Sequence, residues 1–168
     1  KVGPGLDPET IVRLAEILDP DREPGRLTFI HRFGRDAIES GLPPVLEAVR
    51  ATGRTPLWVC DPMHGNTRSV TPSSGSLAGT AVKTRSFDDI LVELERAFEV
   101  HSACGTMLGG VHFELTGENV TECVGGARGL GDADLGHAYR SQVDPRLNYE
   151  QALEMAMLIA RRMRGEKS

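Results

Sequence analysis

The chain has 168 residues, 39% of them hydrophobic, and a formal net charge of -5, values typical of one globular domain or part of one. No apolar run approaches the ~20 residues of a membrane span and no charged-then-apolar leader opens the sequence, so we expect a cytoplasmic protein without a membrane segment. Because the charges are mixed along the chain and acidic overall, the composition argues against a nucleic-acid-binding protein.

The first half of the sequence predicts helices and strands in alternation. Asp7-Pro8 opens an apolar-periodic run, which predicts a capped helix that ends near Asp19. Leu27-Thr-Phe-Ile30 is typical of a short buried strand. A second helix is expected from Pro43-Pro44 to Gly53, and a strand follows from Pro56 to Cys60.

The second half continues this alternation. Ser86 and Asp89 suggest a capping box for a helix that ends at Gly105, and a strand is expected at 110–114. After a glycine-rich loop we expect a short helical stretch at 132–139. Asn148 is the expected cap of the last helix, whose apolar face includes Leu153, Ala156, Ile159, Ala160 and Met163. Strands that alternate with helices of this length imply right-handed βαβ units and a parallel sheet.

The number of predicted units suggests part of a barrel. Three or four units cannot close a (β/α)8 TIM barrel, which needs ~200 residues or more. We therefore expect residues 1–168 to form the C-terminal portion, about half, of an α/β TIM barrel, and the abrupt start at Lys1-Val-Gly-Pro-Gly favours missing upstream sequence. An open doubly wound sheet is disfavoured because no glycine-rich dinucleotide motif follows any strand. A half-barrel exposes sheet edges and apolar surface, so we expect the N-terminal half of the same barrel as a partner, and a homo-oligomer.

The cysteine pattern excludes two classes of small domain. Cys60, Cys104 and Cys123 form neither an even-numbered framework nor a C-x-x-C pair. This argues against both a disulfide scaffold and a zinc ribbon, and we expect free thiols.

Three side chains with metal-binding chemistry lie at or after predicted strand ends, or in a late loop that can fold over the same face. They are His64, Glu114 and Asp144. One imidazole and two carboxylates suit Mn²⁺, Fe²⁺, Co²⁺ or Zn²⁺ better than a thiolate-rich structural zinc site. Taken singly, His64 could equally hold a turn, and Asp144 before Pro145 is typical of a turn. Glu114 is the stronger indication, because a carboxylate in an apolar strand is costly unless it is paired or bound to metal.

Cationic side chains form a second set of candidates. They are Lys1, Arg32 and Arg35 at predicted strand exits, where they suit a phosphate or carboxylate, and arginine gives bidentate contacts. The alternative, a solvated surface charge, is favoured for Arg35 and is the weaker interpretation for Arg32. Lys83 and Arg85 are expected only to lead into the next helix, and the Ser/Gly-rich stretch 69–79 to form a mobile loop above the site.

Five ordered motifs extend over nearly the whole chain. They are Lys1-x-Gly-Pro, Glu23-Pro-Gly-Arg-Leu-Thr with Arg32 beyond it, Cys60-Asp-Pro-Met-His-Gly-Asn-Thr67, His112-x-Glu-x-Thr-Gly-Glu-Asn-Val-Thr-Glu-Cys123 and Asp144-Pro-Arg-Leu-Asn148. Together they resemble the type II (plant-like) 3-deoxy-D-arabino-heptulosonate 7-phosphate (DAHP) synthases. The resemblance implies a (β/α)8 barrel that condenses phosphoenolpyruvate with erythrose 4-phosphate.

The resemblance also implies roles for single residues. His64, Glu114 and Asp144 match three of the family's four metal ligands, and Lys1 and Arg32 match the residues that hold phosphoenolpyruvate. The fourth ligand, a cysteine, and the Lys-Pro-Arg-Ser motif that binds the sugar phosphate both lie upstream in the family, and none of the three cysteines here occupies that position. The implied cofactor is a divalent metal, Mn²⁺ first, with Co²⁺, Fe²⁺ or Zn²⁺ as alternatives.

The implied reaction is a metal-dependent aldol-type condensation, the first step of the shikimate pathway that leads to aromatic amino acids or secondary metabolites. In it Lys1 would orient phosphoenolpyruvate and assist proton transfer, and His64 would ligate the metal through one ring nitrogen while an acceptor fixes the other. Two alternatives remain open: an amino-DAHP synthase of an aminoshikimate pathway, and a non-catalytic half-barrel that acts as an interaction module. As an isolated fragment, the chain is expected to be inactive.

Overall fold

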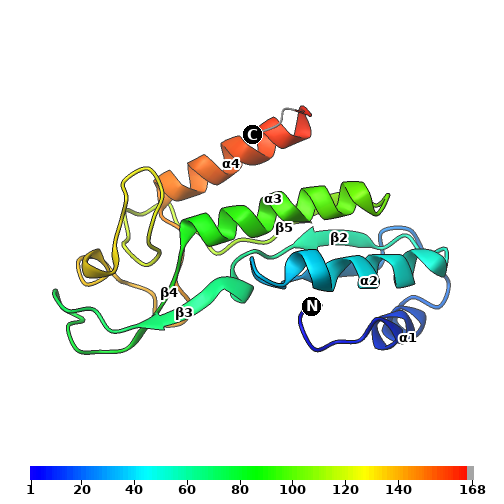
Figure 1. Cartoon of the computed structure of the whole chain (residues 1–168), viewed down its shortest axis with the longest axis horizontal. Coiled ribbons are helices and arrows are strands. Elements are labelled where there is room, and N and C mark those ends of the chain that lie inside the picture. Colours follow the sequence, from blue (N-terminus) through cyan, green and yellow to red (C-terminus); the bar gives the residue numbers. More distant parts are fainter. Residues whose placement is uncertain (166–168) are drawn as a thin grey trace. The chain divides into compact units, whose positions relative to one another are not determined.

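The computed structural model describes residues 1–165 (Figure 1). The described helices are α1 (Pro8–Leu18), α2 (Ile38–Ala51), α3 (Phe87–Ala103) and α4 (Tyr149–Met163). The described strands are β1 (Thr28–His31), β2 (Leu57–Cys60), β3 (Thr67–Val70), β4 (Val82–Arg85) and β5 (Leu108–Val111). Among these helices, none combines the length and the apolar content needed to cross a membrane. The chain divides into two compact units: the first comprises Lys1–Gly65 and Val92–Phe113, and the second comprises residues 66–91 and 114–165.

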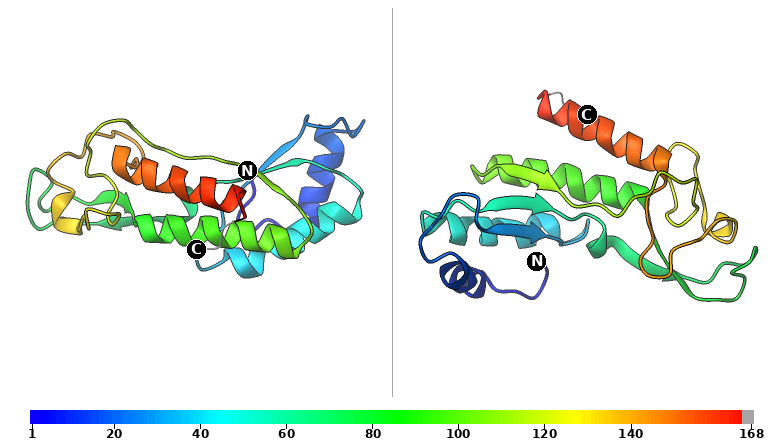
Figure 2. Two further views of the ribbon diagram at one scale, coloured as in Figure 1. Left: turned by 90° about the horizontal axis from the view of Figure 1, so that it is seen from above. Right: turned by 180° about the vertical axis from the view of Figure 1, so that it is seen from behind.

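The first unit is built on a three-stranded parallel sheet in the order β1-β2-β5, which the view from behind shows side by side (Figure 2). This finding confirms the predicted α/β class with a parallel sheet. Thr28–His31 pairs in register with Leu57–Cys60. Parallel neighbours need a crossover connection, and α2 supplies the one between β1 and β2.

Burial in the first unit follows the period of each element. Phe29 and His31 on β1, and Trp58 and Cys60 on β2, are buried, while the positions between them are more exposed. The rings of Phe29 and Trp58 lie 5.2 Å apart between centroids. This alternation determines which side chains of the two strands lie in the core.

Helix α2 begins earlier than the sequence predicts. The prediction started it at Pro43-Pro44, but the helix starts at Ile38 and contains both prolines. Ile38 and Leu42 are fully buried and lie one helical turn apart, so burial of this face extends the helix past the prolines. The carbonyls that the prolines cannot bond belong to Glu39 and Ser40, which are exposed to water.

Strand β5 covers Leu108–Val111, so the predicted strand at 110–114 is wrong at both ends. Gly109 lies close to the neighbouring strand, where an added Cβ would collide with the side chain of Leu57. Glu114 therefore lies in the segment after the strand, with 28% of its side chain exposed. Its placement in an apolar strand was incorrect.

The second unit contains an antiparallel hairpin, β3–β4, that the sequence analysis missed. Lys83 and Arg85, which were expected to lead into a helix, lie on β4, and part of the stretch 69–79 belongs to β3 rather than to a loop. The helical stretch expected at 132–139 is reduced to a 3-10 turn at Asp132–Asp134.

Helix α4 begins where the sequence predicts, because the Asn148 side chain accepts hydrogen bonds from the first-turn amides of the helix, including that of Gln151. Its buried residues are Gln151 and Met155. Leu153 and Met163, assigned to the apolar face, are instead exposed in the described chain.

The three cysteines are free thiols, as predicted. Cys60 and Cys123 are buried, and burial raises the pKa of the Cys123 thiol to about 12. A buried thiol with a raised pKa is a poor nucleophile, so Cys123 serves the packing of the second unit.

Candidate functional site

The residues that follow β2 form the first part of the site. Asp61 comes directly after the strand, and His64 opens a short 3-10 turn. His64 Nδ1 lies 2.9 Å from Asp61 Oδ1 and 2.8 Å from Oδ2. Because an ionised carboxylate only accepts hydrogen bonds, Nδ1 carries a proton that it donates to Asp61. An imidazole held in this way through Nδ1 has Nε2 as the nitrogen suited to bind a metal.

Asp61 is fully buried and accepts several hydrogen bonds. Lys1 Nζ donates to Oδ2 at 3.0 Å, and the backbone amides of Met63 and His64 donate to Oδ1 at 3.1 and 3.2 Å. Burial alone would raise the pKa of Asp61, but the hydrogen bonds from His64 and Lys1 outweigh burial and hold the pKa below its ordinary value. The carboxylate is therefore ionised at neutral pH.

Lys1, Arg32 and His64 line one hollow of the first unit, with a volume of about 240 Å³. The Lys1 side chain is 38% exposed and Arg32 is exposed, so both cations are accessible to an anion. Two cations at the edge of a small hollow suit a phosphate or a carboxylate. The structure thus brings together three of the residues that the sequence singled out.

Close backbone packing holds the loops around this hollow. A Cβ on Gly65 would collide with the backbone nitrogen of Gly34, so only glycine allows the two loops to approach. The buried Glu93 carboxylate accepts the backbone amides of Phe33 and Gly34, each at 2.9 Å. Glu93 thereby fixes the segment that directly follows Arg32.

In the second unit, Glu114 and Asp144 lie close together. A carboxylate oxygen of one is within 4.8 Å of a carboxylate oxygen of the other. The segments that carry them are joined, because Leu147 N donates to Glu114 O and Thr116 N donates to Leu147 O, both at 2.9 Å. Both side chains are 28% exposed, so a cation in solution can reach them.

Two cations from β4 accompany these carboxylates. Lys83 Nζ lies 2.7 Å from Asp144 Oδ1. The fully buried Arg85 forms an ion pair with Glu114, donates to Pro145 O at 2.6 Å, and donates to Thr67 Oγ1 at 2.8 Å. The two cations offset the repulsion between neighbouring carboxylates. Arg85 also links Glu114 to the backbone next to Asp144.

The loop that carries Asp144 depends on a buried carboxylate, Glu122. Glu122 accepts the backbone amides of Arg140, Ser141 and Arg146 at 2.8 to 3.0 Å, and pairs with the Arg146 guanidinium at 2.7 Å. Burial alone would raise the pKa of Glu122, but the hydrogen bonds from Arg146 outweigh it and lower that pKa.

Sequence reasoning missed Asp61, Arg85, Glu93 and Glu122. Asp61 was within reach, because it directly follows a predicted strand and precedes His64 by one turn. The other three are charged residues that are buried, and a charge is stable in the interior only with partners that lie far along the chain. No local pattern shows such partners.

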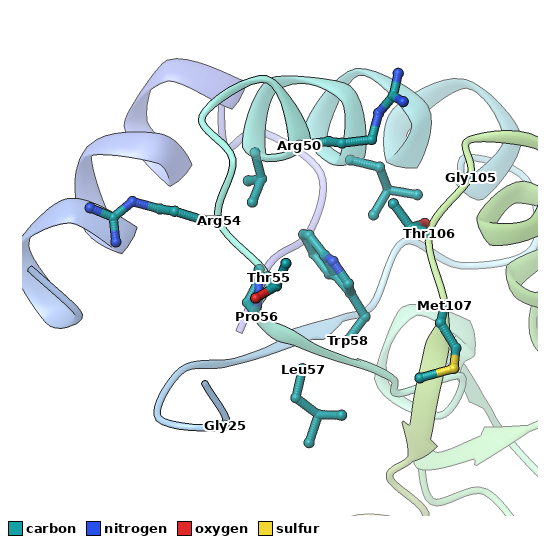
Figure 3. Close-up of a pocket in the computed structure, with 12 residues that line it drawn as sticks. Gly25, Arg50, Arg54, Thr55, Pro56, Leu57, Trp58, Gly105, Thr106 and Met107 are labelled. Atoms are coloured by element: carbon teal, nitrogen blue, oxygen red, sulfur yellow. The ribbon is translucent and has the colours of Figure 1, made fainter. Parts of the chain in front are cut away.

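A second hollow of the first unit, of about 450 Å³, lies at the opposite end of β2 and β5 (Figure 3). Leu57, Trp58 and Met107 form part of its walls, and the guanidinium groups of Arg50 and Arg54 extend away from the Trp58 ring. Its walls are mostly apolar. It differs in this from the hollow at the carboxyl ends of the strands, which Lys1, Arg32 and His64 line.

The chain is similar to one family of known proteins. The sequence profile of the Class-II DAHP synthetase family matches residues 1–160. The phospho-2-dehydro-3-deoxyheptonate aldolase AroG of Mycolicibacterium smegmatis is 49% identical over 164 residues, covering 98% of this chain and 34% of the relative. The aldolase of the same name from Streptomyces coelicolor is 48% identical over 166 residues, covering 99% and 35%.

A fungal relative gives a similar result. The phospho-2-dehydro-3-deoxyheptonate aldolase of Neurospora crassa is 45% identical over 169 residues, which cover 99% of this chain and 34% of the relative. The chain thus spans about a third of the length of the curated relatives it matches.

Proposed function

Because the chain belongs to the Class-II DAHP synthetase family, as its five motifs predict, we propose that its protein condenses phosphoenolpyruvate with erythrose 4-phosphate to give DAHP and phosphate. The observation that carries the proposal is the hollow of the first unit, where Lys1, Arg32 and His64 face one space. The relatives' names support this activity. They favour neither the amino analogue nor a non-catalytic module.

In the proposed reaction, the enol carbon of phosphoenolpyruvate forms a bond to the aldehyde carbon of erythrose 4-phosphate. Water then adds at C2, and phosphate leaves. Arg32 binds the phosphate or carboxylate of phosphoenolpyruvate with two parallel hydrogen bonds, and Lys1 offsets the remaining negative charge. Lys1 Nζ also holds a proton next to the reacting atoms, where it assists proton transfer. Holding the substrate in one orientation supplies a large part of the rate.

We further propose that His64, Glu114 and Asp144 hold a divalent metal, Mn²⁺ first and otherwise Co²⁺, Fe²⁺ or Zn²⁺. One imidazole whose Nδ1 is bonded to Asp61 and two neighbouring, partly exposed carboxylates fit such a cation. When bound, the metal polarises the aldehyde oxygen. The structure pairs His64 with Asp61 and Glu114 with Arg85.

The parallel sheet of the first unit supports a finer proposal about the fold. We propose that it forms part of a (β/α)8 barrel, with the site residues at the carboxyl ends of the strands. Arg32 follows β1 and His64 follows β2, so two successive strand ends deliver the two side chains to one hollow.

The experiment that tests the proposal is a phosphate-release assay on the intact protein with both substrates and Mn²⁺. Phosphate should appear only when both substrates are present, and His64→Ala should reduce the rate by at least about a hundredfold, as expected when a catalytic metal ligand is lost. The matched control is His137→Ala, because the side chain of His137 is 64% exposed in the second unit. Unchanged activity in His64→Ala would remove the metal assignment. Absence of phosphate release with the wild-type protein would remove the proposed reaction.

A further inference from the structure

A single buried carboxylate contacts both kinds of functional group in the first unit. Asp61 Oδ2 lies 3.0 Å from Lys1 Nζ and 2.8 Å from His64 Nδ1. Lys1 belongs to the proposed substrate-binding set, and His64 belongs to the proposed metal-binding set. Nothing in the proposed roles of Lys1 and His64 requires that they share a partner.

We propose that Asp61 is a positioning residue that sets the tautomer of His64 and the position of the Lys1 ammonium together, so that the metal ligand and the substrate-binding lysine are held by one carboxylate. This inference rests on the proposed function. The inference assigns Asp61 a role in the proposed reaction although Asp61 contacts neither the substrate nor the metal.

The backbone makes Asp61 a rigid support. Its own N–H donates to His31 O at 2.8 Å, which continues the ladder between β1 and β2 by one residue. Its side chain is fully buried and accepts the backbone amides of Met63 and His64. Because the backbone and the side chain of Asp61 are both held by hydrogen bonds, the two carboxylate oxygens keep their positions whether or not Lys1 contacts a substrate or His64 contacts a metal.

The two partners use the carboxylate differently, which makes the inference testable. In Asp61→Asn, the amide oxygen can still accept from the Met63 and His64 amides and from His64 Nδ1, but the amide nitrogen would face the Lys1 ammonium, donor against donor. Asp61→Asn should therefore release Lys1 selectively. Asp61→Ala should release both Lys1 and His64.

The first measurement is the affinity of the intact protein for phosphoenolpyruvate without added metal, by calorimetry. Lys1→Met should weaken binding by about tenfold in the wild type, the size expected for one charge-assisted hydrogen bond, and by less than about threefold in the Asp61→Asn background. The same cycle with Asp36→Asn, an exposed aspartate of the first unit, should be additive. If Lys1→Met weakens phosphoenolpyruvate binding equally in the wild type and in Asp61→Asn, Asp61 does not position Lys1 and the proposal is overturned.

The second measurement is Mn²⁺ affinity by electron paramagnetic resonance. Asp61→Ala should weaken Mn²⁺ binding by about 10–100-fold, as for other groups that orient a ligating histidine, whereas Lys1→Met should leave it within about threefold. Equal Mn²⁺ affinity in Asp61→Ala and wild type would overturn the proposal. If the wild type binds neither Mn²⁺ nor phosphoenolpyruvate, the proposed function fails and this inference fails with it.

A third measurement needs no variant of Asp61 and therefore remains decisive if these variants do not fold. Nitrogen-15 NMR of the wild-type protein, with the His64 signal assigned by its loss in His64→Ala, should show a proton on Nδ1. An Nδ1 without a proton would contradict the hydrogen bond from His64 to Asp61 and overturn the inference.

Discussion

In the first unit, Asp61 and His64 directly follow a strand of a parallel sheet, whereas in the second unit Glu114 and Asp144 lie in loops. The backbone ladder between β1 and β2 extends to Asp61, and the side chain of Asp61 holds His64. The second pair is fixed by buried charges, Arg85 and Glu122, that reach across the unit to several partners. A sheet edge and a buried ion-pair network can thus each hold the proposed ligand side chains, with different sensitivities to mutation.

The largest expected effect is the loss of the buried cation. Arg85→Met removes the buried ion-pair partner of Glu114 and the donor to Pro145 O, so we expect the free energy of unfolding to fall by about 3–5 kcal/mol. Urea denaturation followed by circular dichroism measures it. Arg68→Met, which removes an exposed ion pair with Asp132 from the same hairpin, should cost at most about 1 kcal/mol. Equal losses in both variants would show that no buried network holds the second unit.

The next largest effect is the pH dependence of stability caused by two buried histidines of the first unit. Burial lowers the pKa of His31 to about 3 and that of His101 to about 4, so both are neutral when folded. Below the unfolded pKa of about 6.5, the unfolded chain takes up protons that the folded chain does not. Stability should therefore fall from pH 6.5 downward, by about 1.4 kcal/mol per pH unit for each histidine.

This pH dependence is checked by urea denaturation between pH 7 and pH 5. The variant His31→Leu should show about half the slope of the wild type over this range, because one of the two buried histidines is gone. A slope unchanged by the variant would mean that His31 does not resist protonation. The exposed His137 provides the control, since His137→Leu should leave the slope as it is.

A smaller effect tests how tightly the loops around the first hollow pack. Gly65→Ala places a Cβ against the Gly34 backbone, so we expect a loss of about 1–3 kcal/mol in stability together with weaker phosphoenolpyruvate binding. Gly117→Ala, where a Cβ would meet no atom within 4 Å, is the matched control. Full affinity for phosphoenolpyruvate in Gly65→Ala would show that this close approach does not position Arg32 and His64.

The smallest expected effect concerns Asn148, at the end of the loop that carries Asp144. Asn148 caps α4 and donates to Val120 O at 3.2 Å, so Asn148→Ala should lower the unfolding free energy by about 1 kcal/mol. Thermal denaturation measures the change, with the exposed Asn119→Ala as control. An unchanged melting temperature in Asn148→Ala would mean that this cap stabilises neither α4 nor the loop that carries Asp144.

Sequence patterns predicted the first unit better than the second. The strand–helix alternation and the end of β2 at Cys60 are local features, and the structure agrees with both, whereas β1 lies at Thr28–His31, one residue later than predicted. The cap Asn148 in the second unit is also a local feature and is confirmed. The motifs also identified the family correctly. The start of α2 was predicted too late because the burial of Ile38 and Leu42 outweighs the local effect of two prolines.

The second unit was harder to predict for a physical reason. Strands β3 and β4 carry polar and charged residues on both faces, so they lack the alternation that marks a half-buried strand. Arg85 is buried only because Glu114 and Pro145, distant along the sequence, meet it there. Such charges pair through tertiary structure, which a single sequence read locally does not contain.

The most direct test of the account is a Mn²⁺ titration of the intact protein, followed by electron paramagnetic resonance, for the wild type and for His64→Ala, Glu114→Gln and Asp144→Asn. We predict one site in the wild type and at least about tenfold weaker binding in each variant, because each of the three side chains is a proposed ligand of the same metal. Variants that bind Mn²⁺ as tightly as the wild type would contradict the claim.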